Sequence, residues 1–300
     1  MLQKFNPLNK DLQIYVKDRL YHRSEAKVSV FDSVVQGGDA VWEGLRVYKG
    51  GVFVLDRHLD RLMSSAKAMH FQNVPTREEI TAAVFKTLKA NEMTDGVHVR
   101  LTLTRGEKLT SGMDPRLNTM GCTLIIVPEH KAPVYDNDHG INIITSSIRR
   151  NSPAHLDSKI HHNNLINNIL AKIESNVAGA DAALMLDANG FAAELNGTNI
   201  FMSKNNILYT PFADACLPGI TRGLILEIAR EEGVEVHEKN LSLTELYSAD
   251  EVFCTGTMGE LTPITSIDER IIENTGNSNL MLRLTNAFEA KIPEYSVIIV

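Results

Sequence analysis

The sequence predicts two domains of mixed α and β structure. The chain has 300 residues, of which 43% are hydrophobic and 22% charged, a composition typical of globular proteins. Short runs with strand character alternate with segments of helical periodicity in both halves of the chain. A polar stretch that contains Pro133 and has no apolar periodicity separates the halves. We therefore expect a small α/β domain at 1–128, a connecting loop at 129–139 and a larger domain at 140–300.

Composition and charge argue against several classes of partner. The net charge is -7, and the longest basic run is the pair Arg149–Arg150, which disfavours a nucleic-acid partner. The sequence has no signal-peptide core and no apolar run near the about 18 residues of a spanning helix, so we expect no membrane partner. Cys122, Cys216 and Cys254 are odd in number and far apart. They fit buried thiols in a cytoplasmic protein better than disulfides or a metal site.

The first half contains clear strand and helix patterns. We expect strands at Leu12–Val16 and at 51–55, and tight bends among the glycines between residues 28 and 46. A capping box of Thr76 and Glu79 predicts the start of one helix. Another helix is expected from Asp56, and it is predicted to bury one face that consists of Leu59, Leu62, Met63, Ala66 and Met69.

The stretch Val97–Thr104 alternates strictly between apolar and polar residues and so predicts a strand with two different faces. Its polar face is either solvated or a binding surface, and the solvated interpretation is the more common one for antiparallel strands. The polar residues on this face are His98, Arg100, Thr102 and Thr104.

The second half is richer in strands. A helix is expected from Ile220 to Gly233, and a last helix around Asn279–Lys291. Strands are expected at 122–127 in the first half and at 141–147, 180–187, 190–196, 199–204, 207–212 and 250–254 in the second.

Lys159 is the main candidate for a reactive group. Asp157 and Ser158 are good N-cap residues, and apolar residues recur afterwards at helical spacing, so we expect Lys159 at the start of a helix. The positive end of the helix dipole should lower the pKa of its ammonium group, as a nucleophilic amine requires. For a single lysine, however, a solvated surface position is the more common outcome.

Three further features fit a phosphorylated cofactor that carries an aldehyde. Gly219-Ile220-Thr221 opens a predicted helix, whose free backbone N–H groups form an anion site. Thr255-Gly256-Thr257 follows a predicted strand and offers hydroxyl groups beside a glycine, although Gly-Thr turns are common. Glu194 lies in an apolar strand, where a carboxylate needs a partner, and a protonated ring nitrogen is one such partner.

Four motifs carry a family resemblance: SKIHHNNLINNILA, GFAAELNGTNIF, LPGITRG and TGTMGELTP. In this order and spacing they resemble the fold-type IV pyridoxal-phosphate aminotransferases, which have the D-amino-acid aminotransferase-like architecture, and most of all the branched-chain amino acid aminotransferases. The resemblance extends from about Val28 to the last helix. It implies pyridoxal 5'-phosphate as cofactor, with Lys159 in the internal aldimine and Glu194 at the pyridine nitrogen. It also implies phosphate binding by Ile220, Thr221 and Thr257, and by Arg61 of the His-x-x-Arg pattern in HLDRL.

The resemblance implies a transaminase that moves the amino group between branched-chain or related hydrophobic L-amino acids and 2-oxoglutarate. The family's Tyr-x-Arg motif reads His98-Val99-Arg100 here, so Arg100 matches and His98 replaces the tyrosine. Asn164 stands where a tyrosine usually contacts the phenolic oxygen of the cofactor. These departures leave the amino donor and its stereochemistry open. The residues implied to bind the substrate are Gln36, in place of an aromatic hydroxyl, Trp42, in place of phenylalanine, Gly44, His98, Arg100 and Met258.

Other interpretations stay open. A relative of the same fold acts on D-amino acids or (R)-amines, or is an aminodeoxychorismate-lyase-like enzyme. The D-amino acid enzymes use an Arg-x-His carboxylate trap, whereas the corresponding loop here has Arg116 and no histidine two residues later. A silent binding or regulatory protein with a metal at His161-His162 is disfavoured, because adjacent helical residues diverge by about 100°. The resemblance also implies a homodimer or higher homo-oligomer, and a biosynthetic or degradative role is left open.

Overall fold

The computed structural model describes residues 3–274 and 279–299 of the chain. Their contacts define two compact units of mixed α and β structure, the fold class that the sequence predicts. The N-terminal unit contains the described residues of Leu2–Ala132, Ile160–Asn164 and Ile292–Val300. The C-terminal unit contains those of Pro133–Lys159 and Leu165–Lys291. Because these units are defined by contacts alone, the domain limits 1–128, 129–139 and 140–300 stay a prediction.

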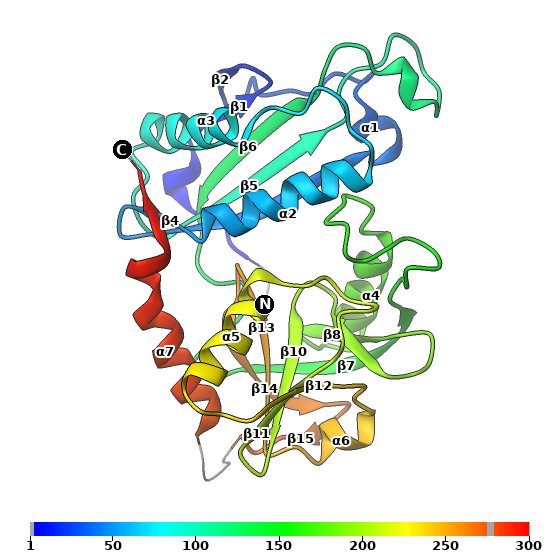
Figure 1. Cartoon of the computed structure of the whole chain (residues 1–300), viewed down its shortest axis with the longest axis vertical. Coiled ribbons are helices and arrows are strands. Elements are labelled where there is room, and N and C mark those ends of the chain that lie inside the picture. Colours follow the sequence, from blue (N-terminus) through cyan, green and yellow to red (C-terminus); the bar gives the residue numbers. More distant parts are fainter. Residues whose placement is uncertain (1–2, 275–278, 300) are drawn as a thin grey trace. The chain divides into compact units, whose positions relative to one another are not determined.

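Within the described residues, the N-terminal unit is built on one seven-stranded sheet with the order β16-β4-β3-β5-β6-β1-β2. Neighbouring strands are antiparallel, and the helices α2 and α3 pack against one face of the sheet (Figure 1). The elements are η1 (Pro7–Asn9), β1 (Gln13–Val16), β2 (Arg19–His22), α1 (Ser33–Gly37), β3 (Ala40–Tyr48), β4 (Gly51–Phe53), α2 (Leu55–Ala68), α3 (Arg77–Ala90), β5 (Val97–Thr104), η2 (Pro115–Leu117), β6 (Thr123–His130) and β16 (Ser296–Ile298).

The helices of this unit form where the sequence predicts them. In α2 the periodic residues Leu59, Leu62 and Ala66 are buried against the sheet. The capping box before α3 is complete, because Thr76 and Glu79 each accept a hydrogen bond from the other's backbone N–H. Their reciprocal bonds satisfy two of the N–H groups that a helix start leaves without partners.

The solvated interpretation of the polar face of β5 is wrong. β5 lies between β3 and β6, so it is a central strand and not a half-exposed one. On its polar face His98, Thr102 and Thr104 are buried, and the Thr104 hydroxyl donates to Asp32 Oδ2 at 2.9 Å. Arg100 is partly buried on the same face. The alternation therefore separates an apolar core face from a second, polar interior face.

In the C-terminal unit, nine of the described strands form one mixed sheet with the order β12-β11-β10-β13-β14-β7-β8-β9, and β15 pairs with β14. The apolar core lies between this sheet and the residues around α6. The elements are β7 (Ile141–Arg149), α4 (Ile166–Val177), β8 (Ala182–Leu186), β9 (Ala192–Leu195), β10 (Asn199–Lys204), β11 (Ile207–Thr210), α5 (Ile220–Glu231), β12 (Val236–Glu238), α6 (Leu243–Tyr247), β13 (Glu251–Gly256), β14 (Glu260–Ile267), β15 (Arg270–Ile271) and α7 (Leu280–Tyr295).

The predicted helix start at Lys159 is wrong, because α4 begins only at Ile166. Asp157 does accept a backbone hydrogen bond, but from the N–H of Lys159 itself, at 3.0 Å, in a turn within the preceding loop. Asparagine and aspartate side chains form such local turns as readily as they cap helices, so the N-cap signal was ambiguous. The argument from the helix dipole therefore does not apply to Lys159.

The apolar residues that recur at helical spacing in α4 lie on an exposed face of the helix. Within the described helices this segment is unusual, because its apolar residues follow one another at helical spacing and yet face solvent. We call this surface the α4 stripe, and it consists of Ile166, Ile169, Leu170, Ile173 and Val177. No helix in the described part of the chain combines the length and the apolar character that crossing a lipid bilayer requires.

Candidate active site

Lys159 lies in the loop between β7 and α4, and its side chain is 43% exposed. Its Nζ is 3.9 Å from Asp157 Oδ1, a long ion pair between two solvated side chains. The loop around it is held by side chains, because Ser158 Oγ donates to the Asn151 carbonyl at 2.6 Å and Asn167 Nδ2 donates to Asn151 Oδ1 at 2.9 Å. The backbone of Lys159 is therefore fixed while its amine stays accessible.

Glu194 lies in β9, where it is almost fully buried. Its Oε1 is 2.6 Å from Nη2 of Arg150, which is buried as well. Arg150 Nη1 also donates to Asn168 Oδ1, at 3.2 Å. The partner that the buried carboxylate requires is thus an arginine of the protein, and the burial of Glu194 alone does not require a ring nitrogen.

Asn199, the first residue of β10, connects Glu194 with the start of α5. Its Nδ2 donates to Glu194 Oε2 at 3.3 Å and to the Leu217 carbonyl at 2.9 Å. A Cβ atom on Gly219 would lie only 2.1 Å from Asn199 Oδ1, so only glycine fits there. Gly219 is the N-cap of α5 and provides no side-chain acceptor, which leaves the N–H groups of the first turn, including that of Thr221, available to an anion.

The turn between β13 and β14 contains Thr257 and Met258, and it begins close to Asn199. Thr255 pairs with Asn199 across β13 and β10. The Thr255 hydroxyl is buried and makes no hydrogen bond with any described residue. Gly256 follows, and a Cβ there would lie 3.0 Å from Thr198 Cγ2. Glu194, the start of α5 and this turn are therefore brought together around Asn199.

The Cys216 thiol reports the charges of this region. Its pKa is raised to about 12, mainly by burial and also by the Glu194 carboxylate. The cations of Arg150 and Lys159, together with Arg222, oppose that rise.

In the N-terminal unit, four of the predicted residues share one face of the antiparallel pair β3 and β5. Gly44 pairs with Arg100, and Arg46 pairs with His98. Trp42 is two residues before Gly44 and therefore lies on the same face. A Cβ on Gly44 would lie 3.0 Å from His98 Nε2, so the glycine leaves room for the imidazole.

The guanidinium of Arg100 is stacked and anchored. Its Cζ lies 3.3 Å from the ring centroid of Trp42, and its Nη2 donates to Asn163 Oδ1 at 3.0 Å. Burial lowers the pKa of Arg100 to about 10, against the opposing charge of Glu43, so the side chain is a cation at neutral pH. Burial and nearby cations lower the pKa of His98 to about 3, which makes this imidazole neutral.

Arg61 lies on α2 and binds Glu43, which is fully buried in β3. Its Nε and Nη2 donate to the two carboxylate oxygens of Glu43, at 2.8 and 2.6 Å. The same carboxylate accepts hydrogen bonds from His58 Nδ1 at 2.7 Å and from His161 Nδ1 at 3.1 Å. Burial raises the pKa of Glu43, but His161 and the guanidinium of Arg61 outweigh that effect and hold the pKa well below its usual range.

Gln36 and Asn164 lie near the end of α1. Gln36 is exposed on α1, and its Nε2 donates to the Val30 carbonyl at 3.3 Å. Asn164 Nδ2 donates to the carbonyl of Gly38, the residue that ends α1, at 3.2 Å.

The pair His161-His162 does not lie on a helix, so the helical argument against a metal site at this pair rests on a wrong premise. His162 forms an isolated antiparallel bridge with Val41. The two imidazoles have different partners. His161 Nδ1 binds Glu43 Oε1 at 3.1 Å, whereas His162 Nδ1 accepts the N–H of Asn164 at 3.1 Å.

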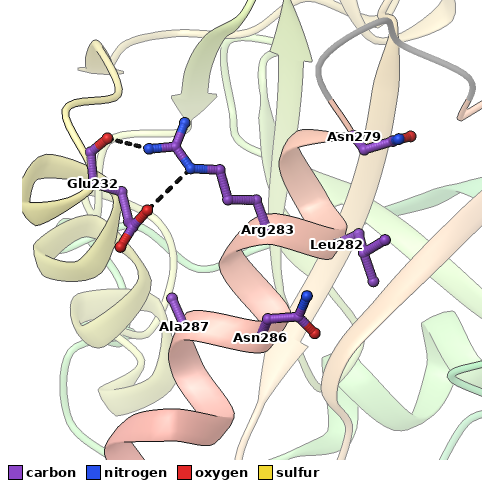
Figure 2. Close-up of a pocket in the computed structure, with 6 residues that line it drawn as sticks. All are labelled: Glu232, Asn279, Leu282, Arg283, Asn286 and Ala287. Atoms are coloured by element: carbon purple, nitrogen blue, oxygen red, sulfur yellow. Dashed lines mark hydrogen bonds and ion pairs between the residues drawn. The ribbon is translucent and has the colours of Figure 1, made fainter.

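A surface groove of about 480 Å³ lies between α7 and the end of α5, and none of the predicted site residues lines it (Figure 2). In Figure 2 the Arg283 side chain points toward Glu232, and its Nε is 3.0 Å from Glu232 Oε2. Both side chains are exposed, so this ion pair is weak. The groove is lined by Glu232, Asn279, Leu282, Arg283, Asn286 and Ala287.

The sequence did not single out Arg150, Asn199 or Glu43. Glu43 had a signal, because a carboxylate between Trp42 and Gly44 in an apolar strand needs partners for the same reason as Glu194. Arg150 had none, since it is one of two adjacent arginines and its partner is far away in the sequence.

The sequence and the fold match those of known proteins. A family model described as amino-transferase class IV matches residues 40–267. The branched-chain-amino-acid aminotransferase-like protein 2 of Arabidopsis thaliana is 58% identical over 283 residues, which are 94% of this chain and 51% of that protein. The chain thus spans about half the length of the first curated relatives it matches.

Two further relatives match along nearly their whole length. The putative branched-chain-amino-acid aminotransferase of Methanocaldococcus jannaschii is 41% identical over 282 residues, 93% of this chain and 96% of that protein. The crystal structure of the T.th. branched-chain amino acid aminotransferase complexed with N-(5'-phosphopyridoxyl)-L-glutamate is 30% identical, with a TM-score of 0.89 and coverage of 97% of this chain and 99% of that one. The family match and these relatives show that the chain belongs to the class IV aminotransferases.

Proposed function

We propose that the chain is a pyridoxal 5'-phosphate-dependent aminotransferase that moves the amino group between branched-chain or related hydrophobic L-amino acids and 2-oxoglutarate. The observation that carries the proposal is the cluster around Asn199. It joins a buried carboxylate, Glu194, to a helix start whose N-cap, Gly219, has no side chain to occupy the anion site. A ligand with a basic ring nitrogen and a phosphate fits these groups, because the carboxylate can bind the protonated nitrogen and the helix start can bind the phosphate.

The fit of the phosphate rests on two features of the C-terminal unit. The first-turn N–H groups of α5, at Ile220 and Thr221, lack a side-chain cap among the described residues. The buried hydroxyl of Thr255 has no hydrogen bond there, and Thr257 follows two residues later. Backbone donors and hydroxyl groups at a helix start bind phosphate well. Arg61, in the N-terminal unit, is proposed to add a positive charge that neutral donors cannot supply.

The remaining groups hold the ring and move protons. When bound, pyridoxal 5'-phosphate supplies an electron sink that stabilises negative charge at Cα of the amino acid. Glu194, which is paired with Arg150, would accept a hydrogen bond from the protonated ring nitrogen. Lys159 would bind the cofactor covalently and move the proton at the substrate Cα. Asn164 would offer a neutral amide beside the phenolic oxygen.

Arg100 supports the substrate assignment. Its guanidinium stacks on the indole of Trp42 and donates to Asn163 Oδ1 at 3.0 Å and to Thr102 Oγ1 at 3.4 Å. The N–H edge of a stacked guanidinium can bind a carboxylate. The aromatic ring on which it stacks can contact a hydrocarbon chain. That surface fits both glutamate and a branched side chain. The other residues proposed to line the substrate site are Gln36, Trp42, Gly44, His98 and Met258.

A homodimer or higher homo-oligomer is proposed as the assembly. The α4 stripe supports it, because five large apolar side chains at helical spacing on one exposed face are typical of protein interfaces. A cytoplasmic location is proposed as well. It is supported by the thiols of Cys122, Cys216 and Cys254, which the structure keeps free and separate.

A panel of amino donors tests the proposed function. The purified chain is supplied with pyridoxal 5'-phosphate and 2-oxoglutarate and is offered leucine, valine, D-alanine or an (R)-amine, and the glutamate formed is measured. We expect glutamate from leucine and valine. Formation from D-alanine or the (R)-amine alone would replace the branched-chain assignment by the alternatives. No glutamate from any donor, with the cofactor bound, would contradict aminotransferase activity.

A further inference from the structure

Asn199 is a buried amide of the C-terminal unit whose contacts fix its orientation. It is the first residue of β10, and it pairs with Thr255 of the neighbouring strand β13. Its Nδ2 donates to Glu194 Oε2 at 3.3 Å and to the Leu217 carbonyl at 2.9 Å. If the amide were turned over, Oδ1 would face these two acceptors, which an amide oxygen cannot bind. Nδ2 therefore faces Glu194, and Oδ1 faces the start of α5, where Gly219 lies.

Gly219 leaves the space that Asn199 Oδ1 occupies. The backbone does not require a glycine at this position, because a φ of -61° and a ψ of 140° are allowed for every residue. The requirement is steric, since a Cβ atom on Gly219 would lie 2.1 Å from Asn199 Oδ1. Gly219→Ala would therefore displace the amide and weaken its hydrogen bonds to the Glu194 carboxylate and the Leu217 carbonyl.

The Leu217 backbone completes the link between α5 and Glu194. Its N–H donates to Glu194 Oε2 at 3.4 Å, and its carbonyl accepts the shorter bond from Asn199. Leu217 is two residues before Gly219, the N-cap of α5. The chain that enters the helix is thus bonded to the carboxylate directly and, through the shorter bond, to the amide beside it. All of these residues belong to the C-terminal unit, so the link is internal to that unit.

We propose that Asn199 is a positioning residue that ties the anion site at the start of α5 to the carboxylate of Glu194. A displacement at one end changes ligand binding at the other, because one buried amide contacts both ends. Such a coupling between two sites acts in both directions. The inference rests on the proposed function, in which the start of α5 binds the phosphate of pyridoxal 5'-phosphate and Glu194 binds its ring nitrogen.

The test measures ligand binding and not turnover. The full-length chain without cofactor is titrated in a calorimeter with pyridoxine, which has the ring nitrogen but neither phosphate nor aldehyde, and separately with inorganic phosphate. For Asn199→Ala we expect the dissociation constants of both probes to rise about ten-fold, as the loss of one hydrogen bond to a charged group does.

Gly219→Ala is the decisive variant, because it adds a methyl group at the start of α5 and removes no group that binds the ring. It should raise the dissociation constant of pyridoxine about ten-fold, since the displaced amide no longer supports Glu194. In Asn199→Ala the clashing amide is absent, so adding Gly219→Ala to that variant should change pyridoxine binding little further.

Asn196→Ala is the matched control. Asn196 Oδ1 accepts the Ala183 N–H at 3.0 Å in the same connection between β9 and β10, so its loss should lower the melting temperature and leave the affinity for both probes unchanged. If Asn199→Ala does not fold, Asn199→Ser replaces it in every comparison.

Three results would overturn the inference. In the first, Asn199→Ala changes the affinity for one probe only or for neither, or changes it no more than Asn196→Ala does. In the second, Gly219→Ala leaves pyridoxine binding unchanged. In the third, Gly219→Ala weakens pyridoxine equally with and without the Asn199 side chain. A wild-type chain that binds neither the probes nor pyridoxal 5'-phosphate would instead contradict the proposed function, and the inference with it.

Discussion

Replacing Arg100 by alanine should separate the two kinds of substrate. If the guanidinium pairs with the distal carboxylate of glutamate, its removal takes away a charge-assisted contact in a partly buried site, which costs about 2–5 kcal/mol. At about 1.4 kcal/mol per factor of ten, kcat/KM for glutamate or 2-oxoglutarate should fall between about 30-fold and a few thousand-fold. Leucine and valine carry no distal charge, so their kcat/KM should fall far less.

Part of the effect is shared by all substrates, and the structure gives its origin. Arg100 stacks on Trp42 with 3.3 Å between Cζ and the ring centroid, and it also binds Asn163. A buried cation–π contact is worth about 2 kcal/mol, so its loss should loosen Trp42 whichever substrate is bound. The informative quantity is therefore the fold decrease in kcat/KM for glutamate divided by the fold decrease for leucine. Arg100→Lys, which keeps the charge and loses the planar stack, should give an intermediate ratio.

The assay measures kcat/KM for leucine with saturating 2-oxoglutarate and for glutamate with a saturating branched-chain 2-oxo acid. Thr102→Val is the matched control, since Thr102 is on the same face of β5 and its removal changes no charge. It should affect both substrates alike. Equal losses in Arg100→Ala would refute the reasoning and give Arg100 a structural role or a role at the α-carboxylate. If kcat/KM for both substrates is unchanged in Arg100→Ala, this face of β5 does not contact the substrate.

Three other regions give predictions of their own. Glu194→Gln leaves buried Arg150 without its counter-charge, so we expect a loss of about 3–5 kcal/mol in urea denaturation and a large fall in kcat. His98 and His161 both have a pKa below the ordinary 6.5 in the folded chain. The unfolded chain therefore binds more protons, and acidification from about pH 7.5 to about pH 5.5 should cost about 1.4 kcal/mol for each histidine in denaturation experiments. Ile169→Glu on the α4 stripe should shift sedimentation velocity toward the monomer.

Controls make each of these results decisive. Glu251 is a buried carboxylate that binds Ser203 and the start of α7, so Glu251→Gln should lose stability while kcat stays high. An unchanged kcat in Glu194→Gln would make that carboxylate structural. Stability that does not fall on acidification, or a pH dependence of stability that is no smaller in His98→Gln than in the wild type, would contradict the prediction that His98 is buried and neutral. An Ile169→Glu variant that sediments like the wild type would exclude the stripe from the interface.

Elements with local signals were predictable from the sequence. The capping box at Thr76 and the glycine after α5 at Gly233 each act within one turn of chain, and α3 and α5 form as expected. The alternation in β5 gave the strand and its two faces, but not their burial. Burial depends on β3 and β6, which lie far away in the sequence on either side of it.

The candidate site was predictable where a motif carries it and not where its contacts are long-range. Glu194 was identified, whereas its partner Arg150 was not, because a pair formed between β9 and the loop after β7 leaves no periodic trace. The environment of Lys159 was misread for a related reason. Asp157 satisfies a turn or a helix cap equally well, and the sequence contains nothing that chooses between them. The contact of His161 with Glu43 likewise joins residues that are more than a hundred positions apart.

The central claim is that Lys159 is the reactive amine of a pyridoxal 5'-phosphate-dependent aminotransferase. The most direct measurement compares glutamate formation from leucine and 2-oxoglutarate by the wild-type chain and by Lys159→Ala, with cofactor binding followed separately by absorbance. We predict that the variant still binds pyridoxal 5'-phosphate through the cluster around Asn199 and forms no glutamate above background. Turnover near the wild-type rate in Lys159→Ala would contradict the account.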